Sequence, residues 1–485
     1  MKDVEPPENP QLGRSFLRGS ALLGSSNWFS AVINFVLSLW LARLLGPSIF
    51  GLYAFAFAVN EFVNLVAAFG ISTAVLQARE ESQELYDSAF VLSGLLAAAG
   101  LLISLVIAPV LASEHSFEAG WLLVGFGVFR IFTMLGLLHR ARLERQLRYG
   151  ALAVIGLATA NLPSLGAVAG AWAGLGIWSL MLRDGLAALL QFGTTFAISG
   201  YRFQRRFNRE SLSRLIKFSG ALFVSRAVEI ALTRADRLVV SSFAGDKVLG
   251  LYHQSMVLSE TGITVLRPIY QVSFNLFARV QDDPRRLARS YELASFVISR
   301  LTVAGGLVLF CAPEQTIRLL LGEEWMGASS MLRWLGIYGA LLPIDANMKQ
   351  MLIARGRLKT LTKIRLAQLV TLGFGLAVAA SLQSIQAVVG ATVIVWILGT
   401  LLCIAANHRV GGRAVLEVFI VPLLAALGAA TSLHWAGQAG WLDALPYWSI
   451  LLLLPSVYAL LVGLLEARKL VSEFHYLREQ MREAD

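Results

Sequence analysis

Residues 85–111, LYDSAFVLSGLLAAAGLLISLVIAPVL, contain a single charged side chain, Asp87, near their start. Residues 415–433 form a second apolar run of this kind, with Glu417 as the single charge. A helix of about 20 apolar residues spans the roughly 30 Å hydrocarbon core of a bilayer. Both runs therefore predict membrane-spanning helices.

The composition extends this prediction to the whole chain. Of its 485 residues, 56% are hydrophobic and 15% are charged, and the mean hydropathy is +0.65. Soluble domains are about 45–50% apolar and about 25% charged. We expect an all-α polytopic membrane protein, because a soluble protein could not cover so much apolar surface.

The N-terminal segment and the two cysteines give no indication of a catalytic or metal site. The first 18 residues are polar and contain proline, and the apolar run that follows has no signal-peptidase-like site, which predicts a cytoplasmic tail and a first membrane helix. Cys311 and Cys403 lie in apolar runs and are interpreted as small buried hydrophobic residues. No His, Cys, Asp and Glu cluster has zinc-like spacing, so neither a metal nor a cofactor is predicted.

The apolar runs predict about 14 transmembrane helices. They form two six-helix lobes, two extra C-terminal helices and polar tails. The predicted spans are 19–44, 50–77, 87–112, 119–138, 150–170, 172–199, 216–243, 248–278, 291–321, 330–353, 362–382, 385–406, 414–436 and 446–466. The corresponding divisions are a tail (1–18), an N-terminal lobe (19–200), a C-terminal lobe (201–410), spans 13 and 14 (411–466) and an amphipathic cytoplasmic tail (467–485).

The loops alternate in charge. The loops after spans 4, 6, 8 and 10 are basic, at residues 139–149, 201–217, 279–289 and 355–365, whereas residues 113–120 and 322–327 are acidic. Lys and Arg are enriched in cytoplasmic loops, so both termini are predicted to be cytoplasmic. The net charge of +10 is explained in the same way, and no nucleic acid partner is expected.

A shift of 199 residues aligns two stretches of the chain. Gly46, Gly51, Leu52, Tyr53 and Glu61 fall on Gly245, Gly250, Leu251, Tyr252 and Glu260. The shift corresponds to six spans, so the two halves are predicted to be parallel repeats, with the substrate path at their interface.

Polar residues share single faces in the first two spans of each repeat, which predicts a water-filled cavity between the lobes. The members are Asn27, Ser30, Asn34 and Ser38 in span 1; Tyr53, Asn60, Glu61 and Asn64 in span 2; Ser219, Arg226, Glu229, Thr233, Asp236 and Arg237 in span 7; and Glu260, Thr264, Arg267, Gln271 and Asn275 in span 8.

Arginine is the most informative member of this set. Arg226 and Arg267 lie too deep in their spans to reach the surface easily, and Arg130 of span 4 is a third such residue. Guanidinium binds phosphate oxygens bidentately and stays charged, so these residues suit an anionic group such as pyrophosphate. The predicted substrate site is Arg226, Arg267, Arg130, Asn27, Asn34, Asn64 and Gln271, and Glu61, Glu260 and Asp236 are candidates for ion coupling.

The alternative for the polar residues is hydrogen bonding between packed spans, at roughly 0.6 kcal/mol each. This interpretation is favoured for Ser30, Ser38 and Thr264. Glu229 lies three residues after Arg226 and is suited to neutralise it, and Asp236 with Arg237 is equally well explained as a structural pair. Arg183 and Asp184 in span 6, and Asp345 and Lys349 in span 10, are further candidates.

Residues 41–53 (LARLLGPSIFGLY) and 69–77 (FGISTAVLQ) resemble the opening of Wzx-type polysaccharide-export flippases, which share a superfamily with lipid II flippases and MATE exporters. Residues 234–240 (RADRLVV), before Gly245, resemble the second-lobe entry of the same family. The resemblance implies a two-lobed, alternating-access transporter in the bacterial inner membrane.

By this resemblance, the substrate would be an undecaprenyl-pyrophosphate-linked oligosaccharide, moved from the cytoplasmic to the periplasmic leaflet for exopolysaccharide, capsule or O-antigen synthesis. The implied partners are this lipid-linked oligosaccharide, membrane lipids, and the polysaccharide polymerase and chain-length regulator. The family motifs do not define substrate residues, so the candidate site rests on the polar stripes alone.

Three other functions are compatible with a multi-span membrane protein. A MATE-like ion-coupled exporter of small molecules needs acidic ion sites, commonly in the first span, and span 1 has no Asp or Glu. A membrane glycosyltransferase, polymerase or ligase usually carries a sizeable outer loop, and the predicted outer loops are short. No GxxxxGK[ST] motif occurs, so ATP hydrolysis is not predicted. A scaffold protein is the remaining alternative.

Overall fold

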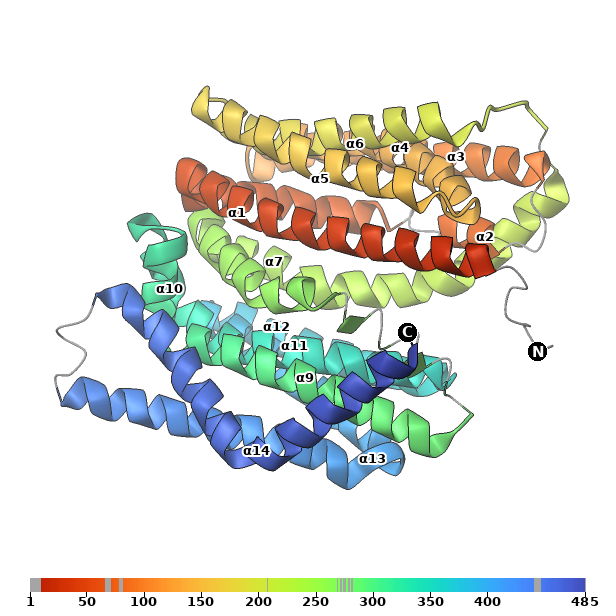
Figure 1. Cartoon of the computed structure of the whole chain (residues 1–485). Coiled ribbons are helices and arrows are strands. Elements are labelled where there is room, and N and C mark those ends of the chain that lie inside the picture. The colour runs from red at the N-terminus through yellow and green to blue at the C-terminus, as the bar shows by residue number, and fades with distance from the viewer. Residues whose placement is uncertain are drawn as a thin grey trace. The chain divides into compact units, whose positions relative to one another are not determined.

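The computed structural model is all-helical in the part of the chain that it describes (Figure 1). Two compact units, residues 1–250 and 251–485, are each described by themselves. The described residues are 10–65, 71–77, 82–206, 208–267, 269–270, 273, 276–277, 280, 282–439 and 446–484.

The first unit contains seven helices or parts of helices. They are α1 (Pro10–Val63), α2 (Ile71–Gln77), α3 (Gln83–Glu114), α4 (Phe117–Arg145), α5 (Tyr149–Trp172), α6 (Trp178–Ser199) and the first part of α7 (Arg209–Val265). Helix α1 packs against α5, α3 against α4, and α6 against both α4 and α5. Serine side chains start two of these helices: Ser82 Oγ accepts a hydrogen bond from the Leu85 amide at 3.1 Å, and Ser116 Oγ accepts one from Ala119 at 3.1 Å.

The second unit begins with the end of α7 and continues to the C-terminus. Its helices are α9 (Pro284–Cys311), α10 (Pro313–Leu320), the 3-10 helix η1 (Glu323–Ala328), α11 (Ser329–Ala354), α12 (Leu358–Leu382), α13 (Ile385–Gln438), η2 (Tyr447–Ser449) and α14 (Ile450–Ala484). Helix α11 packs against α9 and α13, and α12 packs against α13. Predicted span 9 is divided, because Pro313 begins α10 directly after α9 ends.

The two glycines aligned by the 199-residue shift have the same unusual backbone conformation. Gly46 has φ 72° and ψ 171° within α1, and Gly245 has φ 74° and ψ 171° within α7. Only glycine adopts this region readily. Each glycine therefore separates two spans inside one long helix, and the repeat predicted from the sequence is confirmed at these turns.

The two glycine turns also pack closely against each other inside the first unit. A Cβ atom built on Gly51 would lie 1.7 Å from the Asp246 carbonyl oxygen, and one built on Gly250 would lie 1.8 Å from that of Pro47. These two contacts are related by the same 199-residue shift. Beside them, His115 Nε2 lies 2.8 Å from Asp246 Oδ1 and joins the end of α3 to the turn in α7.

The chain is a multi-pass membrane protein. Within the described ranges, nine helical segments are long and apolar enough to cross a membrane. Helices α6 and α7 are not among these nine segments. They contain charged residues, including the site candidates Arg183 and Arg226.

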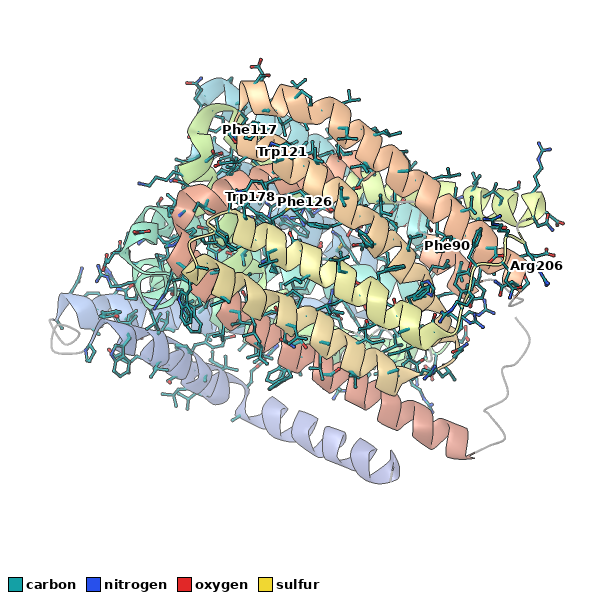
Figure 2. The ribbon with its side chains drawn as sticks, turned by 90° about the horizontal axis from the view of Figure 1, so that it is seen from above. Phe90, Phe117, Trp121, Phe126, Trp178 and Arg206 are labelled. Carbon is teal, nitrogen blue, oxygen red and sulfur yellow. The ribbon has the colours of Figure 1, made fainter. Side chains whose placement is uncertain are left out.

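The ends of the first unit differ in chemistry, as expected for a membrane protein. Trp40, Trp121, Trp172 and Trp178 are between 42% and 64% exposed, and each lies near a predicted outer turn. Figure 2 shows Trp121 and Trp178 toward one end of the unit and Arg206 at the other. Tryptophan gathers at membrane interfaces. The distribution fits the predicted topology, and the cytoplasmic position of the termini stays a prediction.

A buried ion pair holds α14 to the second unit. The Arg300 guanidinium in α9 makes two-pronged contact with the carboxylate of Glu466, with Nε donating to Oε2 at 3.0 Å. Arg300 also donates to the Val418 carbonyl in α13 at 2.9 Å. Helix α14 is kinked at Glu466, where the predicted cytoplasmic tail begins. The tail is helical as far as Ala484, and its side chains lie outside the described part.

Candidate functional site

Four charged residues from three helices of the first unit form the central feature of the candidate site. Glu61 belongs to the second half of α1, Arg130 to α4, and Arg226 and Glu229 to α7. Arg130 interacts electrostatically with both Glu61, which attracts it, and Arg226, which repels it. The three predicted residues from separate helices are thus brought near one another.

The guanidinium groups of this charged cluster retain hydrogen-bonding capacity. The buried Nε atom of Arg130 has no hydrogen-bond partner among the described residues. Arg226 Nη1 lies 3.2 Å from Glu229 Oε2, yet both side chains are 48% exposed. An unpaired buried donor is costly, so an incoming acceptor such as a phosphate oxygen would be stabilised here.

The amide residues of the polar stripes mostly make contacts inside their own unit. Asn34 donates to the side chain of Asn161 at 3.3 Å and accepts a hydrogen bond from Ser164, both in α5. Asn64 is buried and donates to Asn60 Oδ1 at 2.6 Å. The contacts of Asn34 join α1 to α5, as in the alternative of hydrogen bonding between packed spans, whereas the bond of Asn64 lies within its own span.

Two predicted residues cannot be placed, and one belongs to the second unit. Gln271 and the side chain of Asn27 lie outside the described part of the chain. Arg267 lies two residues beyond the end of α7, in the second unit, and its side chain is exposed.

The three acidic coupling candidates have different surroundings. Glu61 lies beside Arg130. Glu260 accepts a hydrogen bond from the Tyr338 hydroxyl at 2.9 Å in the second unit. Asp236 is buried and bonds to the Arg237 amide at 2.9 Å, with the Arg237 side chain 3.5 Å away. Asp236 therefore has the contacts of a structural pair.

A tyrosine aligned by the repeat links the two charges of span 6. The Tyr53 hydroxyl donates to Asp184 Oδ2 at 2.5 Å and accepts a hydrogen bond from Arg183 Nη2 at 2.9 Å. Phe126, labelled in Figure 2, packs edge-on against Tyr53. This arrangement gives Arg183 and Asp184 a structural role that connects α6 to α1.

Asp87 organises the end of the first unit that is predicted to be cytoplasmic, and this role is not among the sequence predictions. Its carboxylate accepts hydrogen bonds from the Tyr201 hydroxyl at 2.7 Å and from the Gln204 and Arg206 amides at 3.1 and 2.8 Å. Burial and the bond to Asp87 raise the pKa of Tyr201 above its usual value. The loop before α7 is therefore fixed to α3.

The second unit contains another buried ion pair, between Asp345 and Lys349 of α11. Lys349 Nζ lies 2.7 Å from Asp345 Oδ2 and donates to Gln368 Oε1 of α12 at 3.1 Å. It also lies 4.9 Å from the centre of the Trp396 ring. The lysine charge is thus satisfied by groups from three helices of the unit.

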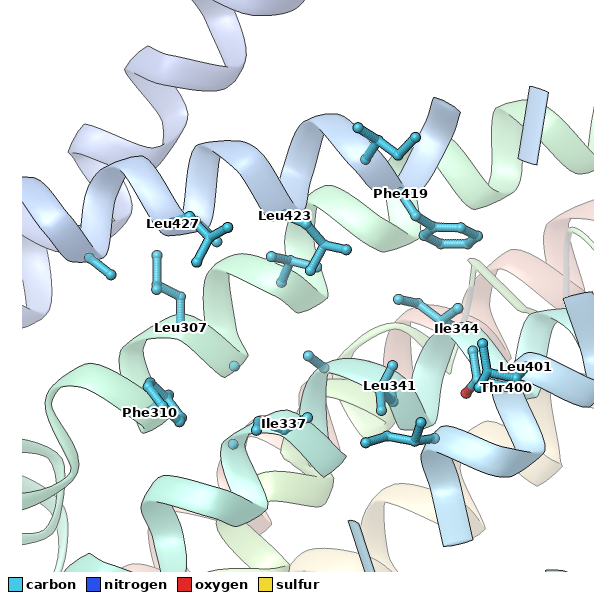
Figure 3. A pocket seen from close by; sticks show the side chains of 18 of the residues that line it. Leu307, Phe310, Ile337, Leu341, Ile344, Thr400, Leu401, Phe419, Leu423 and Leu427 are labelled. Atoms are coloured by element: carbon cyan, nitrogen blue, oxygen red, sulfur yellow. The ribbon is translucent and has the colours of Figure 1, made fainter. Parts of the chain in front are cut away.

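An apolar groove of about 570 Å³ lies between α9, α11 and the two halves of α13 (Figure 3). Leu307, Ile337, Leu341 and Leu423 are among the side chains that line it. Thr400 supplies the single polar side chain of this lining. Such a surface suits hydrocarbon and offers nothing to a charged or sugar-like group.

Among the described residues, no group of three or more His, Cys, Asp or Glu side chains could hold a metal ion. Cys311 and Cys403 are both free thiols. The chemistry available in the described part is therefore that of charged and polar side chains inside a helical membrane protein.

The order of helices and the charged cluster can now be compared with known proteins. The family described as "Polysaccharide biosynthesis protein" matches residues 40–330, which is more than half of the chain. The chain belongs to this polysaccharide biosynthesis protein family. The matched region includes both glycine turns and all three arginines of the predicted substrate site. The resemblance to polysaccharide-export proteins is confirmed.

Two curated relatives have names from the same area of biology. The succinoglycan biosynthesis transport protein ExoT of Rhizobium meliloti (strain 1021) is 25% identical over 328 residues, covering 67% of this chain and 66% of that protein. The lipopolysaccharide biosynthesis protein WzxC of Escherichia coli (strain K12) is 22% identical over 329 residues, covering 65% of each chain. The match thus spans just under two thirds of the length of both relatives.

Solved structures confirm the predicted fold class. The lipid II flippase MurJ in an inward closed conformation has a TM-score of 0.73 at 15% identity, covering 93% of this chain and 100% of that chain. An inward-facing MATE multidrug transporter of the MOP superfamily has a TM-score of 0.58 at 14% identity, covering 80% of this chain and 95% of that chain. At these identities the likeness establishes the fold alone.

Proposed function

We propose that this member of the polysaccharide biosynthesis protein family is a flippase for an undecaprenyl-pyrophosphate-linked oligosaccharide. It moves the repeat unit from the cytoplasmic to the periplasmic leaflet by alternating access, without catalysing a chemical reaction. The protein is placed in the bacterial inner membrane with both termini in the cytoplasm. The proposal is supported by the family membership and by the names of the two relatives, a succinoglycan biosynthesis transport protein and a lipopolysaccharide biosynthesis protein.

The single observation that carries the proposal is the charged cluster of Glu61, Arg130, Arg226 and Glu229. A charged side chain within a membrane-spanning helix costs several kcal/mol unless it faces a polar cavity or a partner. Here the Arg130 Nε donor has no described partner and Arg226 is half-exposed. Two guanidinium groups with spare donors suit a pyrophosphate, which carries several acceptor oxygens.

The acidic members of the charged cluster suggest how the anion is released. Glu61 attracts Arg130, and Glu229 pairs with Arg226 at 3.2 Å. A bound pyrophosphate competes with these carboxylates for the same guanidinium donors. On binding, the guanidinium groups therefore exchange carboxylate partners for phosphate partners. The net gain in binding free energy is small, so the substrate can be released. Arg267 is a further predicted substrate contact, and Glu61, Glu260 and Asp236 remain candidates for ion coupling.

The isoprenoid tail of the substrate is proposed to follow a different path from the pyrophosphate. The isoprenoid tail stays in the bilayer while the head group crosses, because hydrocarbon gains nothing from leaving the lipid phase. A polysaccharide polymerase and a chain-length regulator are the proposed protein partners that use the product.

The test is complementation of a strain that lacks this gene. Arg130→Gln and Arg226→Gln each remove one guanidinium, and the double variant removes both. We expect surface polysaccharide to fall by about tenfold in each single variant, which corresponds to about 1.4 kcal/mol, and to fall below detection in the double variant. Arg226→Lys keeps the charge without the two-pronged donor geometry and should be intermediate.

The matched control is Arg140→Gln. Arg140 is a partly exposed arginine near the C-terminal end of α4, paired with Glu144 at 2.9 Å, and it lies outside the charged cluster. Immunoblots of membrane fractions verify that each variant is inserted in normal amounts. Wild-type export by an inserted Arg130→Gln/Arg226→Gln protein would overturn the assignment of this cluster.

A further inference from the structure

The apolar groove of the second unit continues into a pocket of different chemistry. The two share Phe310 and Ala430 in their linings, so the groove and the pocket adjoin each other. The pocket lies where α9 and α13 end and where α11 begins, which is the predicted extracytoplasmic end of all three helices. Arg333, Trp334, His434 and Gln438 line it, and this set is called the polar mouth below.

The groove is open along one side, as a binding site for a membrane lipid must be. Leu401, Leu423 and Leu427 line it and are 57%, 55% and 63% exposed. In Figure 3 the labelled side chains of α9, α11 and α13 point toward the space between these helices. A volume of about 570 Å³ lies within the range of sites that hold a small ligand. The groove can therefore take hydrocarbon laterally from the bilayer.

The polar mouth has an unbalanced positive charge. Arg333 makes no ion pair with any described residue, and no carboxylate is part of the lining. His434 and Gln438 hydrogen-bond to each other at 3.1 Å, and Trp334 packs edge-on against Phe310 at 5.7 Å. A guanidinium beside an exposed tryptophan at a membrane interface is a suitable receptor for a lipid phosphate.

We propose that the groove and the polar mouth together bind an anionic glycerophospholipid of the extracytoplasmic leaflet. One acyl chain lies in the groove, and the phosphate accepts hydrogen bonds from Arg333. The lipid is anionic because the described mouth has no acidic group to receive the ammonium of a zwitterionic head group. This lipid is distinct from the transported substrate, whose pyrophosphate is assigned to the charged cluster in the first unit.

The bound chain would act as a wedge between α9, α11 and the second half of α13. It would fill the groove with hydrocarbon and make van der Waals contact with the apolar side chains that line it. A ligand that binds only the folded protein stabilises it in proportion to the logarithm of ligand concentration over Kd. The protein should therefore be more thermostable with the lipid that fits.

The experiment uses the full-length protein purified in detergent. Binding of phosphatidylglycerol and phosphatidylcholine with matched acyl chains is measured by native mass spectrometry and by the shift in melting temperature. We expect phosphatidylglycerol to bind at least about tenfold more tightly, as one charge-assisted contact provides. Undecaprenyl phosphate is titrated as a competitor.

Two variants test the polar mouth and the apolar groove separately. Arg333→Gln should remove the preference for phosphatidylglycerol and leave weak binding of both lipids. Ala426→Phe places an aromatic ring in the groove and should abolish binding of both. The matched control is Arg318→Gln, an arginine near the same end that pairs with Glu323 at 2.7 Å, and it should behave as the wild type.

Equal binding of the two phospholipids by the wild type would overturn the proposal, as would an Arg333→Gln variant that keeps the preference. Displacement of phosphatidylglycerol by an equimolar amount of undecaprenyl phosphate would assign the groove to a polyprenyl lipid instead and would also overturn it. If Arg333→Gln fails to fold, the preference of the wild type and the effect of Ala426→Phe test the proposal together, and undiminished binding of both lipids by Ala426→Phe would overturn it. None of these results depends on transport, so failure here is separate from failure of the proposed flippase activity.

Discussion

Gly51→Ala should prevent the two glycine turns of the repeats from meeting. A Cβ atom at Gly51 would lie 1.7 Å from the Asp246 carbonyl oxygen, and Cβ atoms are essentially never found closer than 3.0 Å to a neighbour. Both partners are backbone atoms, so no side chain can rotate away. The turns would have to separate by roughly 1.3 Å, since interiors are closely packed and cannot absorb the added methyl group.

The magnitude follows from this overlap. Forcing an extra methyl group into a packed contact costs about 1–3 kcal/mol, and sometimes more. If the contact forms in one state of a transport cycle and opens in another, that cost disfavours the closed state by about 5-fold to 150-fold. Because the repeat places the same contact at Gly250, Gly250→Ala should have a similar effect.

The assay combines export with crosslinking. His115→Cys and Asp246→Cys replace two side chains that lie 2.8 Å apart beside the turns, in a background where Cys311 and Cys403 are serine. A short thiol crosslinker then reports how often α3 and the turn in α7 are in contact. Gly51→Ala should lower both the crosslinked fraction and surface polysaccharide by at least fivefold.

Gly94→Ala in α3 is the matched control, because a Cβ atom there would meet nothing within 4 Å. It should export and crosslink as the wild type does. Normal crosslinking together with normal export in Gly51→Ala would refute the idea that this close backbone contact is needed.

Two further substitutions test buried contacts that hold each unit together. Arg300→Met leaves the Glu466 carboxylate buried without its partner and should lower the free energy of unfolding by about 3–5 kcal/mol; thermal melts in detergent measure this, and Arg300→Met/Glu466→Leu should recover most of the loss. Tyr201→Phe removes the 2.7 Å hydrogen bond to Asp87 and should cost about 1.5–3 kcal/mol; a melting temperature equal to that of the wild type would show that the backbone amides alone satisfy this carboxylate.

The helices and their breaks could largely be predicted from the sequence. Long apolar runs fix the number and length of the spans because the bilayer has a set thickness. The shift of 199 residues located the two turns, where Gly46 and Gly245 adopt one conformation that other residues avoid. The arginines of the charged cluster could be predicted as site residues from the free-energy cost of a charge inside a membrane span, since such a charge is rarely retained without a role.

The partners of polar side chains could not be predicted. Asn34 bonds to Asn161, 127 positions away, and Arg300 pairs with Glu466, 166 positions away. Helical periodicity states which face of a helix is polar, but not which neighbour that face meets. The polar stripe therefore predicts a cavity position for Asn34, whereas in the structure its amide bonds to side chains of α5. Glu466 is the last residue of predicted span 14, and no sequence pattern pairs it with Arg300, which makes it part of the core.

The most direct test of the proposed flippase activity is the sidedness of lipid-linked oligosaccharide in cells that lack this protein. A membrane-impermeant sugar probe labels only the units that face the periplasm, and mass spectrometry identifies the cargo. We predict full-length repeat units that accumulate on the cytoplasmic face and become accessible when the wild-type gene is restored. Repeat units that reach the periplasmic face normally without the protein would contradict it.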